Sequence, residues 1–413
     1  MTVSSKKNFS TITTRVEEIF NQLVDLRRKL HRFPELAWQE YQTTEKLLSF
    51  LHEHNISNIR RLRETGLVAE IGADESKPIV LLRADIDALP IAERKSVDYA
   101  SQNAGICHAC GHDVHMTISC GVLLILQEFV NELPVNVRVV FQPAEEPIPS
   151  GAPRVIEQGV LKKVQAALGM HVEPALDLGT IGLTEGWVNA QSIRLDWELK
   201  GSGGHSARPQ LASDPLRAGT RLVQDAYKLA HRRWNRPDRP VVLTFTRFTS
   251  SDAYNAIPET ARLTATLRLT DVKVKTRIFE SLFELSRKIE SDTGVKFSFH
   301  VKEGAPPVVN HPALVRQLCQ KWQDVQGSDA QIEMDFRSLG GDDFGWYSRE
   351  VPSALIRFGI GTRSQTPQLH TGFFDVPEDV IRIAVRFFTW QFLSWDFTHI
   401  VASGGQSSLL DSV

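Results

Sequence analysis

The residues of this sequence that could carry chemistry lie in short strings, and the densest of these is GICHACGHDVHM. Cysteine, histidine and aspartate side chains recur there between Cys107 and His115. Thiolate and imidazole groups are the standard protein ligands of transition metals. A structural zinc site would need a second ligand pair at finger spacing, and haem attachment would need CxxCH; the sequence shows neither. We therefore interpret the string as a source of ligands for a metal site.

Two further strings supply paired carboxylates. IVLLRADIDALP contains Asp85 and Asp87, and side chains two apart on a strand share a face, so both could ligate one cation or orient its ligands. The alternative is an ordinary surface turn. VVFQPAEEP contains Glu145 and Glu146. Beside a metal, one of these could ligate while the other takes a proton from water; elsewhere, such a pair is a solvated charge pair.

Two single histidines, His171 in LGMHVEP and His370 in QLHTGFF, each follow an apolar run. A lone histidine in such a place is more often a buried residue with satisfied hydrogen bonds than a ligand. Together with the other strings, they complete a set of one Cys, three His and two Glu. Such a set could hold two metals and leave room for water, whose pKa a metal lowers towards ~7. The set predicts a hydrolytic metal centre.

The elements that must position these residues alternate between strand and helix. Residues 12–55 have helical spacing, and short apolar runs such as IVLLRADID and VNVRVVFQ then alternate with helical segments such as HMTISCGVLLILQEF. This alternation predicts an α/β fold with a mainly parallel sheet covered by helices on both faces. Open sheets of this kind collect ligands at the carboxyl ends of their strands, where the candidate residues fall.

A different pattern occupies residues 190–303. Its elements follow the order β-α-β-β-α-β, which is typical of a ferredoxin-like α+β domain. We therefore predict a catalytic domain in two parts, 12–189 and 304–400, an inserted domain between them, and a mobile tail over 401–413.

The overall composition excludes several classes of protein. The 413 residues carry a net charge of −2 and are 42% hydrophobic, which does not favour nucleic acid or an anionic membrane as a partner. We find neither an apolar run of membrane-spanning length nor a signal-peptide pattern. Only four cysteines occur, which suggests a reducing compartment and predicts a cytoplasmic protein.

Taken in order, the strings LLRADIDALP, HACGHDVH, FQPAEEP, GMHV, GSGGHSARP, NAIPE and QLHTGFF resemble the metal-dependent aminoacylase and carboxypeptidase-G-like amidohydrolases. The most similar branch holds bacterial N-acyl-amino-acid and hippurate hydrolases and plant auxin-conjugate hydrolases. HRFPELAWQE matches the opening pattern of that branch, and the resemblance extends from about residue 20 to 390.

This resemblance implies two divalent cations per subunit, whether zinc, manganese or cobalt. It implies that Glu145 is the general base and that Asp85 and Asp87 lie beside the metals and orient their ligands, because in this branch a cysteine takes the bridging place given elsewhere to aspartate. The implied metal ligands are Cys110, His112, Glu146, His171 and His370.

The resemblance also implies roles for the inserted domain. His205, in GSGGHSARP, matches a histidine that reaches the active site of the other subunit and stabilises the oxyanion. Asn255, in NAIPE, matches a polar residue near the substrate. The family's insert carries the dimer contact, so we expect a homodimer.

Two points concern the substrate. Arginine binds carboxylates bidentately, so we interpret Arg268 as a contact for the substrate carboxylate, with an ordinary surface charge as the alternative. The sequence departs from the family in LGGDDFGWY, where Asp342 replaces a common glutamate while Asp343 and Phe344 match. That departure concerns the choice of substrate more than catalysis.

The expected reaction is hydrolysis of the amide bond of an N-acyl amino acid or a related small amide. Glu145 would take a proton from the attacking water and deliver it to the leaving amine. The alternatives are a carboxypeptidase or dipeptidase and, more remotely, an inactive homologue that only binds its ligand. The presence of every implied ligand and of the base argues against an inactive homologue.

Overall fold

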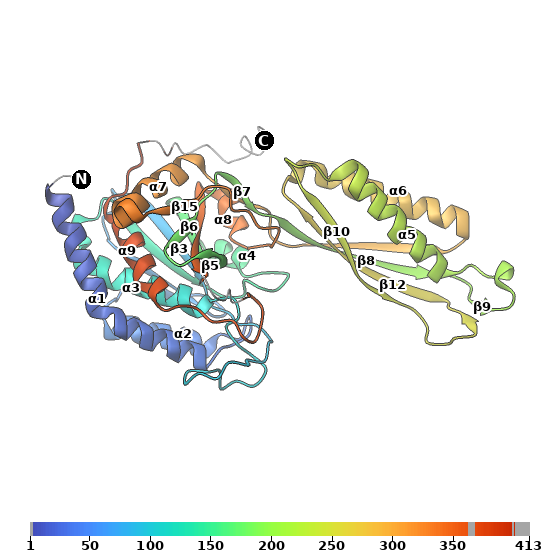
Figure 1. Ribbon diagram of the computed structural model, residues 1–413, viewed down its shortest axis with the longest axis horizontal. Helices are drawn as coiled ribbons and strands as arrows, with labels where there is room; N and C mark the ends of the chain where they lie inside the picture. Colours follow the sequence, from blue (N-terminus) through green and yellow to red (C-terminus); the bar gives the residue numbers. More distant parts are fainter. Residues whose placement is uncertain (1–2, 362–367, 399, 401–413) are drawn as a thin grey trace. The chain divides into compact units, whose positions relative to one another are not determined.

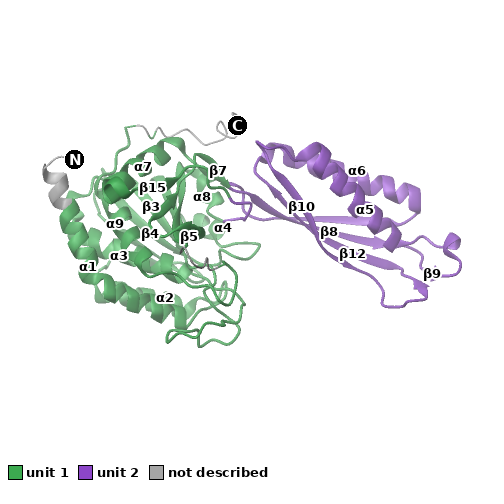
Figure 2. Ribbon diagram, in the orientation of Figure 1, with its two compact units in different colours: residues 1–188, 308–337, 343–412 green, residues 189–307, 338–342, 413 purple. Residues whose placement is uncertain are grey.

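The computed structural model describes residues 3–361, 368–398 and 400, which form two compact units (Figure 2). Unit 2 comprises Asn189–Pro307 and Ser338–Asp342, and the other described residues belong to unit 1. The tail predicted to be mobile, 401–413, lies outside the described residues. Within the described part, no helix is long and apolar enough to cross a membrane.

Unit 1 is built on an eight-stranded sheet with the order β1-β2-β4-β3-β5-β16-β6-β15. Its strands β3, β5, β6 and β15 are labelled in Figure 1. The central strands β4, β3, β5 and β16 run parallel to one another, and β2 joins β4 in the antiparallel sense. This arrangement confirms the predicted α/β class. The strands of unit 1 are β1 (Ile59–Arg61), β2 (Leu67–Ile71), β3 (Ile79–Asp85), β4 (Asn136–Gln142), β5 (Val164–Asp177), β6 (Thr180–Gly182), β7 (Gly186–Asn189), β14 (Val308–Asn310), β15 (Gln331–Glu333) and β16 (Ser353–Gly361).

Helices cover both faces of this sheet, because its central strands are apolar on both sides. Val80 and Leu82 of β3 belong to a core shared with α1, α3 and α9, whereas Leu81 packs in a second core with α4 and α8. The helices of unit 1 are α1 (Val3–Arg32), α2 (Tyr41–Glu53), α3 (His112–Glu128), α4 (Ala152–Glu157), α7 (Pro312–Gln326), α8 (Gly345–Glu350) and α9 (Asp379–Leu393).

The segment predicted to be helical over 12–55 is interrupted between α1 and α2. Pro34 disfavours helical backbone at the residue before it, and α1 ends at Arg32. Glu35 then folds back, and its carboxylate accepts hydrogen bonds from the Gln42 and Thr43 N–H groups at the start of α2, at 3.1 and 2.8 Å. A side chain outside the helix therefore satisfies N–H groups that would otherwise lack partners.

Unit 2 has the predicted β-α-β-β-α-β order, and its four-stranded antiparallel sheet is ordered β10-β12-β8-β13. Asp214 caps α5 by accepting from Leu216 N and Arg217 N at 2.9 and 3.2 Å. Trp197 is fully buried and stacks on Phe245 and Phe299 in the core. The elements are β8 (Gln191–Lys200), β9 (Gly204–His205), α5 (Pro215–Leu229), β10 (Val241–Thr249), β11 (Ala256–Ile257), β12 (Thr260–Leu269), α6 (Lys275–Thr293) and β13 (Lys296–Glu303).

Candidate metal centre

The five metal ligands implied by the sequence lie together in unit 1 and form two groups that share one thiol. Cys110, His112 and His171 make the first group, and Cys110, Glu146 and His370 the second; within each, the potential ligand atoms lie within 4.8 Å of one another. Cys110 Sγ is 3.3 Å from His171 Nε2 and 3.4 Å from His370 Nε2. The thiol is therefore placed where one atom could contact two cations.

The backbone brings these side chains together at the carboxyl edge of the sheet. Gly111 caps α3 in the left-handed conformation, at φ 83°, and a Cβ there would come within 2.4 Å of a Val172 methyl, so this close approach requires glycine. His370 also has positive φ, 58°, and its N–H donates to Ala109 O at 2.8 Å. This hydrogen bond fixes the loop that carries His370 beside the loop that carries Cys110.

Both buried imidazoles of the first group present the same nitrogen towards Cys110. His112 Nδ1 donates to the carbonyl of Asp87 at 2.9 Å, and His171 Nδ1 donates to the carbonyl of Val172 at 2.6 Å. A carbonyl only accepts, so in the neutral form of each ring the proton is on Nδ1 and the lone pair is on Nε2. Burial disfavours the charged form of His112, but the Asp85 carboxylate and hydrogen bonds with Asp87 and Cys110 outweigh it and raise the pKa of His112 well above its usual value, so a bound cation must displace its second proton. Burial, followed by the charge of Arg357, lowers the pKa of His171 well below its usual value and keeps that ring neutral.

These residues fit divalent cations. His112 Nε2 and Glu146 Oε1 are buried and make no hydrogen bond with any described residue, although Asp85 Oδ2 lies 3.6 Å from the first atom and His370 Nε2 lies 3.4 Å from the second. Buried polar atoms without hydrogen bonds are costly unless a ligand meets them. Burial, and then the Glu146 carboxylate, raise the pKa of the Cys110 thiol far above its usual value, so it loses its proton only beside a strong positive charge. Sulfur, imidazole and carboxylate donors together suit zinc and its neighbours among the transition metals.

The two aspartates lie behind the donor atoms and are fully buried. Asp85 accepts from His115 Nδ1 at 2.7 Å and from the Arg83 guanidinium at 2.6 Å. Asp87 holds His112 through its carbonyl, and its side chain accepts from Glu146 N at 3.1 Å. Each aspartate is thus engaged by protein donors that border the metal ligands.

Glu145 follows β4 and is oriented by a residue from a distant part of the chain. Its Oε1 accepts from the backbone N–H of Asp343 at 3.3 Å. The Asp343 carboxylate is itself buried between Arg83 and Gln142, and Gln142 Nε2 donates to it at 2.8 Å. The candidate base is therefore next to a candidate ligand in sequence. It is held by the backbone of Asp343, whose own carboxylate is buried and paired with Arg83.

The other three predicted site residues belong to unit 2. His205 pairs with Ala256 across β9 and β11, and Ser206 N donates to Asn255 O at 3.3 Å, so His205 and Asn255 lie in one small substructure. His205 Nδ1 accepts from Ala207 N at 3.1 Å, which puts the proton of the neutral ring on Nε2. Arg268, in β12, is half-buried and has no ion-pair partner among the described residues.

Two buried residues near the centre, His115 and Arg83, have roles that the sequence motifs did not predict. His115 Nε2 accepts from Val172 N at 3.1 Å while Nδ1 donates to Asp85, so both nitrogens are occupied and this ring holds the strand next to His171. A second histidine three residues after His112 was a visible signal, since the two lie on one helix face. An arginine inside the apolar run IVLLRAD was a signal for a buried charge network.

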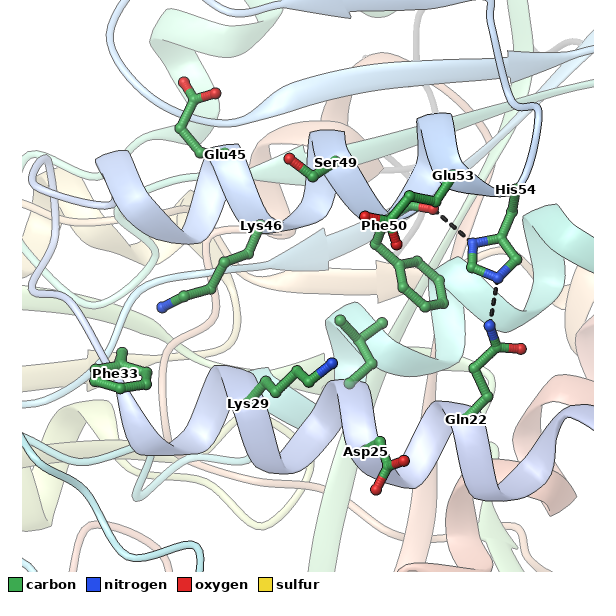
Figure 3. Close-up of a pocket in the computed structure, with 11 residues that line it drawn as sticks. Gln22, Asp25, Lys29, Phe33, Glu45, Lys46, Ser49, Phe50, Glu53 and His54 are labelled. Carbon is green, nitrogen blue, oxygen red and sulfur yellow. Dashed lines mark hydrogen bonds between the residues drawn. The ribbon is translucent and has the colours of Figure 1, made fainter.

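A separate hollow of about 520 Å³ lies between α1 and α2. Figure 3 shows Lys46 and Phe50 entering it from α2, with His54 at one end. The Lys46 ammonium lies 4.5 Å from the centre of the Phe33 ring. None of the candidate metal ligands lines this hollow, so its size alone does not make it the active site.

Comparison with known proteins agrees with this geometry. The model of peptidase family M20/M25/M40 matches residues 81–390, and the chain belongs to that family. This confirms the resemblance drawn from the sequence motifs. The chain is accordingly a metal-dependent amidohydrolase, a class in which two metal ions are bound together.

Individual relatives extend over most of the chain. It is 34% identical to an N-acetyl-L-cysteine deacetylase of Bacillus subtilis, over 82% of this chain and 80% of the relative. It is 33% identical to an IAA-amino acid hydrolase of Arabidopsis thaliana, over 91% of this chain and 86% of the relative. Among solved structures, the Bacillus subtilis YXEP protein, described as a dinuclear metal-binding peptidase of the M20 family, matches with a TM-score of 0.78 and 30% identity, over 91% and 98%.

The two cysteines of the string CHACGH, Cys107 and Cys110, provide a test of the ligand set. Because both donor groups include Cys110, we expect Cys110→Ala to lose most of its bound divalent metal, as measured by elemental analysis after dialysis. Activity should fall with it, by more than the ~10–100-fold that follows loss of a residue that only orients a ligand.

Cys107→Ala is the matched control, since Cys107 is also buried and burial raises the pKa of its thiol to about 11. That variant should keep its metal. Metal loss from Cys107→Ala together with retention in Cys110→Ala would show that the wrong thiol has been identified.

Proposed function

We propose that this enzyme hydrolyses the amide bond of N-acyl amino acids and that Cys110, His112, Glu146, His171 and His370 hold its two divalent cations. The meeting of two three-residue donor groups at Cys110, with Glu145 adjoining, carries this proposal. The deacetylase and the IAA-amino acid hydrolase named above support the substrate class, since both names denote amides of amino acids. The family's peptidases make carboxypeptidase or dipeptidase activity the second candidate.

The bound cations would supply Lewis acidity, polarising the amide carbonyl and acidifying water. The chain's own residues handle the protons. Glu145, oriented by the Asp343 N–H, takes a proton from the attacking water and passes it to the leaving amine. Asp87 contributes by keeping His112 and Glu146 in place. Asp85 contributes by holding His115, whose ring centre lies 5.6 Å from that of His112.

Residues of unit 2 complete the proposed chemistry. His205 is exposed, with its proton on Nε2, and would donate to the oxyanion that forms at the amide carbonyl. Asn255, in the adjoining strand segment, would contact the substrate. Arg268 would bind the substrate carboxylate, for which its half-buried guanidinium without an ion-pair partner among the described residues is suited.

We further propose that unit 2 carries the contact of a homodimer and that His205 acts in the partner's site. Large apolar side chains are exposed on unit 2, including Leu211 at 74% and Tyr254 at 97% exposure, close in sequence to His205 and Asn255. Apolar exposure of this kind is typical of an interface. A cytoplasmic location fits the four cysteines, all of which are free thiols.

A substrate panel tests the activity directly. Purified protein should hydrolyse N-acetylcysteine, hippurate or another N-acyl amino acid, and a chelator should abolish turnover until zinc, manganese or cobalt is restored. Dipeptides and peptides with a free C-terminus should be poorer substrates. Preference for those peptides would favour the second candidate, and no metal-dependent hydrolysis of any amide would refute the proposal.

Loss of the base should separate catalysis from metal binding. Glu145→Gln removes the proton acceptor and keeps the shape, so we expect turnover to fall by ~100-fold or more while metal content stays near that of the wild type. Glu75→Gln, at an exposed position of the same unit, should change neither. Turnover within a few fold of wild type in Glu145→Gln would mean that another group is the base.

Mixing two inactive variants tests whether His205 acts across the dimer. His205→Ala should lower kcat by ~100-fold or more and affect KM less, because an oxyanion donor acts in the transition state. After subunit exchange, a heterodimer of Glu145→Gln and His205→Ala would have one site that keeps both groups. Random pairing makes about half the dimers mixed, so activity should approach about a quarter of the wild-type level.

A double variant, Glu145→Gln with His205→Ala, supplies the control for this mixing experiment. Combined with His205→Ala, it leaves no site with both groups and should recover nothing. Absence of recovery from the two single variants, despite demonstrated exchange, would place His205 in its own subunit's site or outside catalysis.

A further inference from the structure

Glu40 is a buried carboxylate that no step proposed above uses. It stands immediately before α2, in the string HRFPELAWQE, and its side chain does not cap that helix. Its exposure is 0%, and its two oxygens are directed at separate partners. Oε1 accepts from the backbone N–H of Ala144 at 2.9 Å, and Oε2 accepts from the Thr65 hydroxyl at 2.6 Å.

Ala144 is the residue directly before Glu145, and its backbone is unusual. Its φ is 55°, in the left-handed region that residues with a Cβ disfavour. Such a conformation persists only where the surroundings determine it. The surroundings here are Glu40 at the N–H of Ala144 and Gly151, whose N–H donates to the Ala144 carbonyl at 2.6 Å.

Close backbone contacts surround the turn that leads into Ala144. A Cβ on Gly151 would lie 1.9 Å from the Pro143 carbonyl oxygen, and a Cβ on Gly66 would lie 2.3 Å from the Phe141 carbonyl oxygen. The backbone that leads into Ala144 is therefore packed against neighbouring backbone. The direction in which the chain leaves Ala144 determines where the Glu145 and Glu146 side chains point.

We propose that Glu40 is a positioning residue for the active site: by accepting from Ala144 N it sets the left-handed turn that aims Glu145 and Glu146. This rests on the proposed function, in which those two glutamates are the base and a metal ligand. Asp87 fixes Glu146 N and Asp343 fixes the Glu145 carboxylate, so Glu40 supplies the constraint at the beginning of the turn.

The role needs an acceptor at Ala144 N rather than a negative charge. Burial raises the pKa of Glu40 to about 7, so the carboxyl is partly neutral near physiological pH. In Glu40→Gln the amide oxygen can accept from Ala144 N, and the amide NH₂ can donate to the Thr65 hydroxyl. Glu40→Leu keeps similar bulk and has no acceptor, which leaves the Ala144 N–H buried without a partner.

The experiment compares these variants in two readouts. Metal-stripped protein is titrated with Zn²⁺ or Mn²⁺ in a calorimeter, and kcat and KM are measured with the best N-acyl amino acid of the panel. Glu40→Leu should weaken one of the two binding events by ~10–100-fold, the usual effect of removing a group that orients a ligand, and should lower kcat more than it changes KM. Glu40→Gln should restore both to within a few fold of wild type.

Thr65→Val is the matched control, because it removes the other partner of Glu40 and leaves the contact with Ala144. It should lower the melting temperature without altering metal affinity or kcat. If Glu40→Leu does not fold, Glu40→Asp takes its place: its carboxylate is one methylene shorter and should show the same losses.

Wild-type metal affinity and kcat in folded Glu40→Leu or Glu40→Asp would overturn the positioning role. Equal losses in Thr65→Val would also overturn it, since they would point to general destabilisation. Absence of metal binding and hydrolysis in the wild type is a different result, which would refute the proposed function itself.

Discussion

Two hydrogen bonds, from His112 Nδ1 to the Asp87 carbonyl and from His171 Nδ1 to the Val172 carbonyl, determine what the rest of unit 1 can do. A carbonyl has no proton to give, so in the neutral form of each ring the lone pair is on Nε2, facing Cys110. The tautomer of both rings is thereby set by the backbone at the sheet edge. The donor character of the centre is a property of the fold rather than of freely rotating side chains.

Two sets of buried ion pairs lie behind the centre and support this arrangement. Asp113, the residue after His112, accepts from Arg27 and His31 of α1, each at 2.8 Å. On the sheet side, the Arg83 guanidinium donates to the carboxylates of Asp85 and Asp343. A buried charge without its partner costs several kcal/mol, so these pairs resist any shift of the first turn of α3 or of the loops that carry the glutamates.

Much of the fold and of the candidate site could be predicted, because the sequence patterns that indicate them are local. Alternating strand and helix patterns identified the sheet, the order of elements identified the ferredoxin-like insert, and Asp85 and Glu145 fall just where apolar runs end. Motifs spread along the chain then identified the family. The pairing of strands in space was harder to predict from the sequence. For example, β5 lies between β3 and β16, which are far apart in the chain.

The hydrogen-bond roles of individual residues lay beyond sequence reasoning. His112 and His115 look alike in the string, and only the contact of His115 with Val172 N shows that both nitrogens of that ring are engaged, whereas His112 Nε2 makes no hydrogen bond with any described residue. The left-handed backbone of Ala144 has no signature either, since alanine rarely adopts it. The break at Pro34 was a local signal that the helical spacing of the surrounding residues obscured.

The order of the strands has a consequence for how the protein is made. A chain leaves the ribosome from its N-terminus, and domains generally fold as they become complete. The sheet of unit 2 is drawn from one continuous stretch, Gln191–Glu303, so it can form while synthesis continues. The central sheet of unit 1 must wait for β16, Ser353–Gly361, and the candidate metal centre must wait still longer for His370. During that interval the apolar edge of β5 that β16 will cover has no partner, so the inserted unit can be finished before the catalytic unit that precedes it in the sequence.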